Sequence, residues 1–159
     1  MLFRDRDEAG RMLADLLLNL RAARPVVLGI PAGGVLVAQV VARELGAPLG
    51  AVASGCLTET DLEDRTVLVV DEGVNTGATM RAALETVAAA HPRQVFAAAP
   101  VAPRRLSLGR LAADLYAIAR PEPLSSVRRW YAELPEVSED EVRAALGGQD
   151  WAYAGATSL

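Results

Sequence analysis

The sequence contains no lysine, and all 16 of its basic residues are arginines. Schiff-base catalysis needs a lysine amine, and the P-loop of nucleoside triphosphatases needs a lysine beside the bound phosphates. Both kinds of chemistry are therefore excluded for this chain. The glycines from Gly29 to Gly34 also lack the G-x-G-x-x-G spacing of a dinucleotide-binding fold.

Cysteine and histidine occur once each, as Cys56 and His91. One cysteine cannot form an intramolecular disulfide or a cysteine-rich zinc site. Cys56 is interpreted as a small buried or loop thiol rather than a nucleophile, because the single histidine is distant in sequence. His91 precedes Pro92 and indicates the end of a helix rather than a metal ligand.

Aromatic residues make up 4% of the chain, whereas hydrophobic residues make up 52%. A core must therefore be built from alanine, valine and leucine. With 159 residues the chain is long enough for one domain with a sizeable core. The formal net charge of −4 and the isoelectric point of about 5.0 argue against a nucleic-acid partner, because such binding needs a basic surface.

Long apolar runs are also missing. No stretch approaches the roughly 20 apolar residues that cross a bilayer. The first residues, MLFRDRDEAGR, are charged where a signal peptide is apolar. We therefore expect a cytoplasmic protein without a membrane partner.

Apolar periodicity alternates between strand and helix patterns along the chain. The patterns predict strands over residues 26–30, 49–53, 67–70, 94–101 and 115–119, and helices over residues 7–20, 35–45, 78–90, 104–113, 125–134 and 138–146. This alternation predicts an α/β fold, an open parallel sheet flanked by helices on both faces. We expect a single domain over residues 1–159, with a core over about 25–120, an acidic polar loop over 54–65 and C-terminal helices over 125–147.

The most informative segment is VLVVDEGVNTGAT, over residues 67–79. Its four apolar residues indicate a buried, parallel-type strand, which runs into two carboxylates, Asp71 and Glu72. A turn of small residues follows, and then a helix pattern begins. Carboxylates accept hydrogen bonds from hydroxyl groups, and backbone amides at a helix N-terminus bind phosphate, so the segment suits a phosphorylated sugar. The other interpretation is a plain strand-to-helix turn, with solvent-facing acids and Thr76 as a helix cap.

The segment resembles the signature of the type I phosphoribosyltransferases, which bind 5-phosphoribosyl 1-pyrophosphate (PRPP). The resemblance implies that Asp71 and Glu72 hold the ribose hydroxyls and that Asn75 lies near the incoming base. An amide there can hydrogen-bond a base but cannot take its proton. The loop from Asn75 to Thr79, with Thr76, Gly77 and Ala78 between them, is implied to wrap the 5′-phosphate. Gly73 and Val74 are also implied to bind substrate.

A second run, GIPAGGV over residues 29–35, stands where the same family places its pyrophosphate loop. The small residues Ala32, Gly33 and Gly34 would let backbone amides approach phosphate oxygens closely. Taken alone, this run would equally suit a tight turn without a ligand. Because both loops follow strands of a parallel sheet, we expect them at one edge, where α/β proteins bind ligands.

The resemblance covers nearly the whole chain and is strongest to a predicted bacterial branch of the family. The shared residues are Phe3, Asp5, Arg6, Ala9, Gly10, Pro31, Gly33, Gly34, Val35, Pro100 to Pro103, Trp130 and Tyr131. Arg4 and Arg6 are interpreted as helix-entry charges that reach substrate only if the N-terminus folds over the cleft. Trp130 and Tyr131 are interpreted as core or interface anchors.

Three features depart from the family pattern. Ala32 replaces the arginine usual in the pyrophosphate loop, and Glu72 replaces an aspartate. The segment between Val52 and Thr66 is far shorter than the family's, where a lid and a substrate-covering hood are inserted. Two functions therefore stay open: PRPP-dependent phosphoribosyl transfer to a nitrogenous base, or binding of PRPP or a nucleoside monophosphate by a regulatory relative without turnover.

The resemblance implies Mg²⁺ as the cofactor, held mainly through PRPP, with Asp71 as the protein group that could coordinate it directly. The implied partner is a small molecule, PRPP or a nucleoside monophosphate. A homodimer also stays open, because Trp151 and Tyr153 near the C-terminus could form an interface. A third interpretation, the Walker-B strand of an ATPase over residues 67–72, fails because the lysine-containing partner motif is missing.

Overall fold

Six strands form one sheet in the order β3-β2-β1-β4-β5-β6 in the computed structural model, which describes residues 2–58 and 61–149. The strands are β1 (Val26–Gly29), β2 (Leu49–Ala53), β3 (Cys56–Leu57), β4 (Thr66–Val70), β5 (Gln94–Val101) and β6 (Leu115–Ala119). Every neighbouring pair is parallel except β2 with β3. The expected loop over 54–65 therefore needs a correction, because the chain turns at Gly55, with φ of +73°, and Cys56–Leu57 pairs back on β2.

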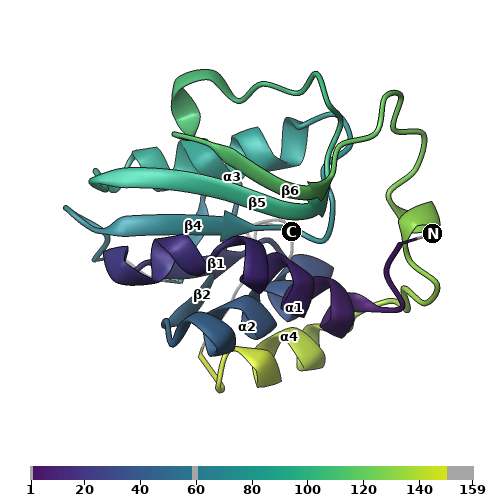
Figure 1. Ribbon diagram of the computed structural model, residues 1–159. Helices are drawn as coiled ribbons and strands as arrows, with labels where there is room; N and C mark the ends of the chain where they lie inside the picture. Colours follow the sequence, from purple (N-terminus) through teal and green to yellow (C-terminus); the bar gives the residue numbers. More distant parts are fainter. Residues whose placement is uncertain (1, 59–60, 150–159) are drawn as a thin grey trace.

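Helices cover both faces of this sheet, as predicted (Figure 1). They are α1 (Arg6–Leu16), α2 (Gly33–Leu45), α3 (Ala78–Ala88) and α4 (Glu139–Ala145). One face packs against α1 and α2, and the other face packs against α3. The short helix α4 lies on α2, where Val142 and Leu146 contact Val35 and Ala51. A Ser138–Glu141 capping box begins this helix, which lies within the helix predicted over 138–146.

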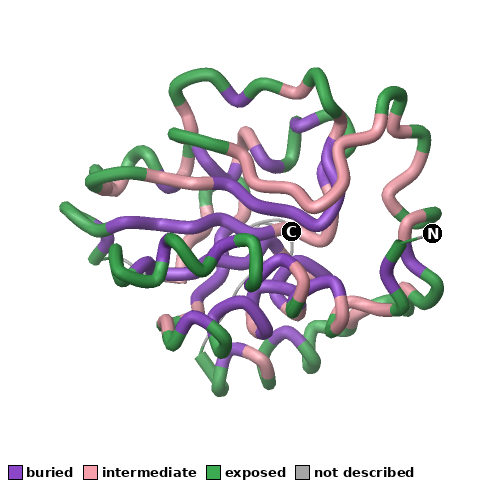
Figure 2. The backbone as a smooth tube through the Cα atoms, viewed as in Figure 1, coloured by how far each residue is buried: buried purple, intermediate pink, exposed green. Residues whose placement is uncertain are grey.

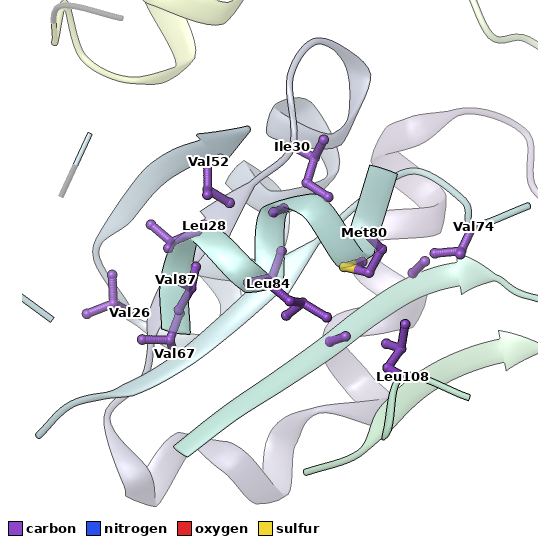
Figure 3. Packing of buried hydrophobic residues seen from close by; sticks show 14 of the residues in the cluster. Val26, Leu28, Ile30, Val52, Val67, Val74, Met80, Leu84, Val87 and Leu108 are labelled. Carbon is purple, nitrogen blue, oxygen red and sulfur yellow. The ribbon is translucent and has the colours of Figure 1, made fainter. Parts of the chain in front are cut away.

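The core is divided by the alternation of side chains along the central strands, which are buried throughout (Figure 2). Leu28, Val67 and Val69 face α3, where Leu84 and Val87 meet them (Figure 3). The alternate residues of the same strands, among them Leu68, face α1 and α2. Aliphatic residues fill these layers, as the low aromatic content requires. Among the described helices, none combines the length and apolarity needed to cross a bilayer.

Two predicted helices are wrong. Over 104–113 the chain forms only a 3₁₀ turn at Gly109–Leu111, because the Arg120 guanidinium binds the carbonyl oxygens of Pro103 and Leu106 in a looped chain. Over 125–134 only Arg128–Trp130 is helical, again as a 3₁₀ turn. The C-terminal helices expected over 125–147 therefore reduce to α4.

The reason for the second correction is a backbone pairing between residues 2–4 and residues 130–133. The Trp130 carbonyl accepts hydrogen bonds from the amides of Leu2 (3.1 Å) and Phe3 (2.9 Å), and the amide of Ala132 donates to the Phe3 carbonyl (2.7 Å). These contacts use backbone groups that a helix would need for itself. Residues 2–4 and 130–133, called here the terminal clasp, thus lie beside the ends of the strands (Figure 1).

The first helix is shorter than predicted, because α1 ends at Leu16 and a 3₁₀ segment, Leu18–Ala23, follows. The tail with Trp151 and Tyr153, which was considered as a dimer interface, lies outside the described residues. Because β1 and β4 are parallel neighbours, the loops after them meet at the carboxyl edge of the sheet, as predicted.

Candidate active site

A cavity of about 380 Å³ opens at the carboxyl edge of the sheet, between the loop after β4 and the segment before the terminal clasp. Its lining residues are Asp71, Glu72, Gly73, Val74, Asn75, Thr76, Gly77, Thr79, Met80, Ser125, Ser126 and Val127. Most residues predicted as substrate contacts are therefore gathered around one space. Ala78 is outside this lining, as are Ala32, Gly33 and Gly34.

Asp71 stands at the point where β4 ends. Its amide donates to the Ala98 carbonyl at 3.1 Å, which extends the pairing with β5 by one residue. Its Oδ1 accepts a hydrogen bond from the Glu72 amide at 2.8 Å. Burial raises the pKa of the Asp71 carboxyl to about 7, against the lowering effect of that hydrogen bond and with a further raising effect from the Glu72 charge. Near neutral pH this group can therefore either donate or accept a proton in a hydrogen bond.

Hydrogen bonds fix both the side chain and the backbone of Glu72. Its Oε2 accepts a hydrogen bond from Arg6 Nε at 2.7 Å, and its backbone carbonyl accepts one from the Tyr131 hydroxyl at 2.6 Å. Arg6 also donates through Nη1 to the carbonyl oxygen of Pro135 at 2.7 Å. The side chains of Arg6 and Glu72 are 11% and 27% exposed, so the pair is largely shielded from solvent. Glu72 is thus a fixed carboxylate rather than a free surface acid.

Tyr131 anchors the terminal clasp to this site. The residue is 5% exposed, and its ring packs against Phe3 with 5.3 Å between the ring centroids. Burial and the Glu72 charge raise the pKa of its phenol well above the ordinary value, so it stays a hydrogen-bond donor. The interpretation of Tyr131 as an anchor is therefore confirmed. Arg6 was expected to reach substrate only if the N-terminus folds over the cleft. Its contact with Glu72 shows that the N-terminus does fold over this edge of the sheet.

The loop over 73–77 is built to leave amides open. Its start is tied to β5, because the Val74 amide donates to the Val101 carbonyl at 2.9 Å. Gly77 adopts φ of +93°, which favours glycine, and α3 begins directly after it. Within the part of the chain that the structure describes, the amides of Asn75, Thr76 and Gly77 make no hydrogen bond. Together with the helix dipole of α3, they form a place for an anion.

Arg81 fixes the back of this loop. Its Nη2 donates to the Ser107 carbonyl at 2.9 Å, and its Nη1 donates to the Thr76 carbonyl at 3.4 Å. A carbonyl of the loop is thereby turned towards the guanidinium. The side chain of Leu106 packs against Gly77 from the same direction. The loop is therefore held from behind by the segment after β5.

The loop after β1 lies behind the acid pair rather than in the cavity. Gly33 and Gly34 are buried at the start of α2. A Cβ atom on Gly34 would stand 2.8 Å from Asp71 Oδ1, and one on Gly33 would collide with the Glu72 carboxylate. These glycines are therefore required by the close approach of the two loops. Their role as pyrophosphate contacts stays a prediction.

Sequence reasoning missed the far wall of the cavity. Ser125, Ser126 and Val127 were expected on a helix, whereas they lie in an irregular segment that lines the cavity. The side chain of Val127 packs directly on Gly73, where a Cβ atom would not fit. No motif marks this segment, because its contact with the loop joins residues about fifty positions apart in the sequence.

The carboxylates could share a metal ion with a ligand but do not form a cage for it. Among residues 2–58 and 61–149, no group of three or more histidine, cysteine, aspartate or glutamate side chains is placed to hold a metal. Mg²⁺ is commonly bound by one or two carboxylates together with substrate phosphates and water. The two carboxylates of Asp71 and Glu72 fit binding of Mg²⁺ that is shared with substrate phosphates and water.

Comparison with known proteins adds a second line of observation. The sequence profile of the phosphoribosyl transferase domain matches residues 54–114. A Mycobacterium tuberculosis protein, named provisionally as a phosphoribosyl transferase, is 29% identical over 217 aligned positions that cover 98% of this chain and 49% of the relative. The chain thus spans about half the length of that curated relative. Because this chain has 159 residues, the relative carries additional residues within the aligned region.

Solved structures agree with the fold. The protein TT1426 of Thermus thermophilus has a TM-score of 0.83 and 31% identity, covering 94% of this chain and 99% of that one. A purine phosphoribosyltransferase of Pyrococcus horikoshii has a TM-score of 0.61 and 23% identity, covering 82% and 87% of the two chains. The similarity to the second protein is a similarity of fold.

Proposed function

Because the chain belongs to the type I phosphoribosyltransferase family, we propose that it binds PRPP and transfers the phosphoribosyl group to a nitrogenous base. One observation carries this proposal. The acid pair Asp71–Glu72 and the open amides of the loop over 73–77 face the same cavity of about 380 Å³. Hydroxyl acceptors and a phosphate site are therefore a short distance apart, as a phosphorylated pentose requires.

In this proposal Asp71 accepts a hydrogen bond from a ribose hydroxyl. Glu72 offers Oε1 to the other hydroxyl, since Oε2 is taken by Arg6. The 5′-phosphate lies on the amides of Asn75, Thr76 and Gly77, with the Thr79 side chain at the start of α3. A carboxylate that is fixed before the ligand arrives loses little entropy on binding, so the geometry favours a positioned sugar.

The reaction proposed is a substitution at C1 of the ribose. The bond from C1 to the pyrophosphate oxygen breaks, and its electron pair leaves with pyrophosphate. A base nitrogen forms the new bond to C1, and its proton, where it carries one, passes to the departing pyrophosphate or to solvent water. Asn75 can orient the base by hydrogen bonds, but its amide cannot accept that proton. The acid pair and the loop then contribute chiefly by holding C1 and the nitrogen in line.

Mg²⁺ is part of this proposal as an ion carried in with PRPP. Asp71, with Glu72 beside it, would be the protein group nearest the ion. When bound, the ion would neutralise charge on the pyrophosphate. The amides of Gly33 and Gly34, at the start of α2, would face the same group. The proposed place for Mg²⁺ depends on the carboxylates of Asp71 and Glu72 at the cavity.

Binding should be tested by titrating PRPP, with and without Mg²⁺, into the unchanged protein and into Asp71→Asn. We expect a heat of binding for the unchanged protein and an affinity at least about tenfold lower for the variant, because the amide loses a charge-assisted hydrogen bond. Asp15→Asn is the matched control, since Asp15 is exposed on α1, away from the cavity. Equal affinities for all three proteins would contradict the assignment of Asp71.

A second function, binding without turnover, is favoured by the edge of the sheet beside β2. There the amide of Thr58 donates to the Ala51 carbonyl at 3.1 Å, and the amide of Ala51 donates to Thr58 Oγ1 at 2.9 Å. The Gly55 amide is tied to Thr86 Oγ1 at 2.9 Å. The turn after β2 is therefore bound to the sheet and to α3, which is a poor place for a lid that excludes water.

Turnover separates the two functions. Pyrophosphate release should be measured with PRPP and a panel of purine and pyrimidine bases. Release that depends on one base supports transfer, and the Asp71→Asn variant should abolish it. Binding of PRPP without release across the panel would favour the regulatory relative.

A further inference from the structure

We propose that Arg6 supplies the positive charge that the loop after β1 lacks, and so makes the acid pair compatible with a polyanionic ligand. This inference rests on the proposed function, because the ligand considered is PRPP. The loop residues Pro31 to Gly34 carry no charge, yet they lie against two carboxylates. An anion at this edge would meet the negative charge of Glu72, and that of Asp71 whenever it is ionised, if nothing compensated them.

Geometry places the Arg6 guanidinium between the two loops. Its Nε stands 2.7 Å from Glu72 Oε2, and a Cβ atom built on Gly33 would lie 2.8 Å from the same Nε. The charge is therefore in contact with the loop after β1 as well as with the acid pair. Because the side chain is only 11% exposed, screening by solvent is weak.

The guanidinium keeps donors for a ligand. An arginine carries five N–H groups, of which Nε bonds Glu72 and Nη1 bonds the Pro135 carbonyl. In the described part of the chain, Nη2 of Arg6 makes no hydrogen bond. The planar fork of an arginine suits the oxygens of a phosphate group, and its orientation here is fixed by the other two contacts.

The terminal clasp explains how a residue so far from the motif reaches it. Arg6 begins α1 directly after the clasp strand, and its second contact, Pro135, lies just beyond the partner strand. Tyr131 joins the clasp to the Glu72 carbonyl. The terminal clasp and the residues next to it therefore bring both the charge of Arg6 and the support of Tyr131 to the site.

The experiment compares PRPP affinity, by calorimetry, in Arg6→Gln, Arg6→Lys and the double variant Arg6→Gln/Ala32→Arg. Loss of charge in Arg6→Gln should weaken binding by about tenfold or more, while Arg6→Lys should keep most of it. The double variant should regain affinity, because an arginine at position 32 restores charge beside Gly33 without restoring the contact with Pro135. Arg4→Gln is the matched control, because Arg4 lies two residues away and its side chain is 62% exposed.

A purely structural role for Arg6 has a different outcome. In that case Arg6→Lys would fail as Arg6→Gln does, and the arginine at position 32 would restore nothing. Equal binding by folded Arg6→Gln and the unchanged protein would overturn the inference alone. No binding by the unchanged protein would overturn the proposed function and this inference with it.

Discussion

Asp71 is a carboxylic acid kept partly out of water at the end of a fully buried strand. Burial raises its pKa to about 7, whereas an aspartate in an unfolded chain titrates at about 3.9. Between these two values the folded protein holds a proton that the unfolded chain has released. Stability therefore falls as the pH rises through this interval, with a limiting slope of about 1.4 kcal/mol per pH unit, and levels off above it.

The first prediction compares Asp71→Asn with the unchanged protein in urea at several pH values. The variant should gain stability relative to the unchanged protein from pH 5 to pH 7, because it removes the cost of ionising a buried acid. The gain should level off above about pH 7. Other carboxylates, such as Asp5 and Asp64, whose pKa values are lowered by their hydrogen bonds, act in the opposite direction and cancel in the difference.

The control is again Asp15→Asn, at an exposed position on α1 away from the cavity. A pH-independent difference for Asp71→Asn would contradict the burial of this acid. Asp71→Asn is also expected to bind PRPP more weakly. Asp71 would therefore lower the stability of the protein while raising its affinity for PRPP.

At the residue scale, the grouping of contiguous motif residues could be predicted and contacts between distant ones could not. Asp71, Asn75 and Thr76 follow one strand in a single short segment, so the sequence was enough to expect them around one cavity, where they lie. Their roles towards a ligand stay predictions. Arg6 meets Glu72 across 66 positions, and Tyr131 meets it across 59. No local pattern encodes such contacts, which depend on how the chain ends pack.

At the scale of elements, the terminal clasp connects the site to the ends of the chain. Its bond to the site is the Tyr131 hydroxyl, which donates to the Glu72 carbonyl at 2.6 Å. A buried carbonyl that loses its donor costs roughly 1–3 kcal/mol. The clasp also shields the Phe3 ring, which is fully buried.

The second prediction is that Tyr131→Phe lowers the free energy of unfolding by about 1–3 kcal/mol and weakens PRPP binding, because Glu72 loses one of its two supports. Tyr116→Phe is the matched control. The Tyr116 ring packs against Phe96 with 6.0 Å between the ring centroids. Within the residues described, the Tyr116 hydroxyl has no partner. We therefore expect the free energy of unfolding of Tyr116→Phe to differ by no more than about 0.5 kcal/mol from that of the unchanged protein. Denaturant unfolding and calorimetry provide both readouts. Equal effects of the two variants would show that the hydroxyl contact contributes nothing.

Elements of the sheet core could be predicted because their patterns are strong. Strands such as Val26–Gly29 and Thr66–Val70 are continuous apolar runs, and their parallel order follows from the alternation with helices. The segments over 104–113 and 125–134 have helical composition. They fold otherwise because Arg120 binds the carbonyl groups of Arg104 and Leu106, and the amides of Leu2 and Phe3 bind that of Trp130. These tertiary bonds outweigh local propensity.

For the whole molecule, charge is divided between the two edges of the sheet. The carboxyl edge carries the acid pair, the open amides and Arg6. Away from it, a cavity of about 440 Å³ is lined by three arginines, Arg21, Arg24 and Arg65, near the starts of β1 and β4. A phosphate attracted by charge alone would prefer these arginines, whereas a sugar phosphate recognised by shape and hydroxyls would prefer the first cavity.

The most direct measurement is a crystal structure of the protein with ribose 5-phosphate, which carries the diol and the phosphate without the pyrophosphate. We predict the phosphate on the amides of Asn75, Thr76 and Gly77 and a ribose hydroxyl within hydrogen-bond distance of Asp71. Ligand density among Arg21, Arg24 and Arg65, with the cavity beside Asp71 empty, would contradict the central claim.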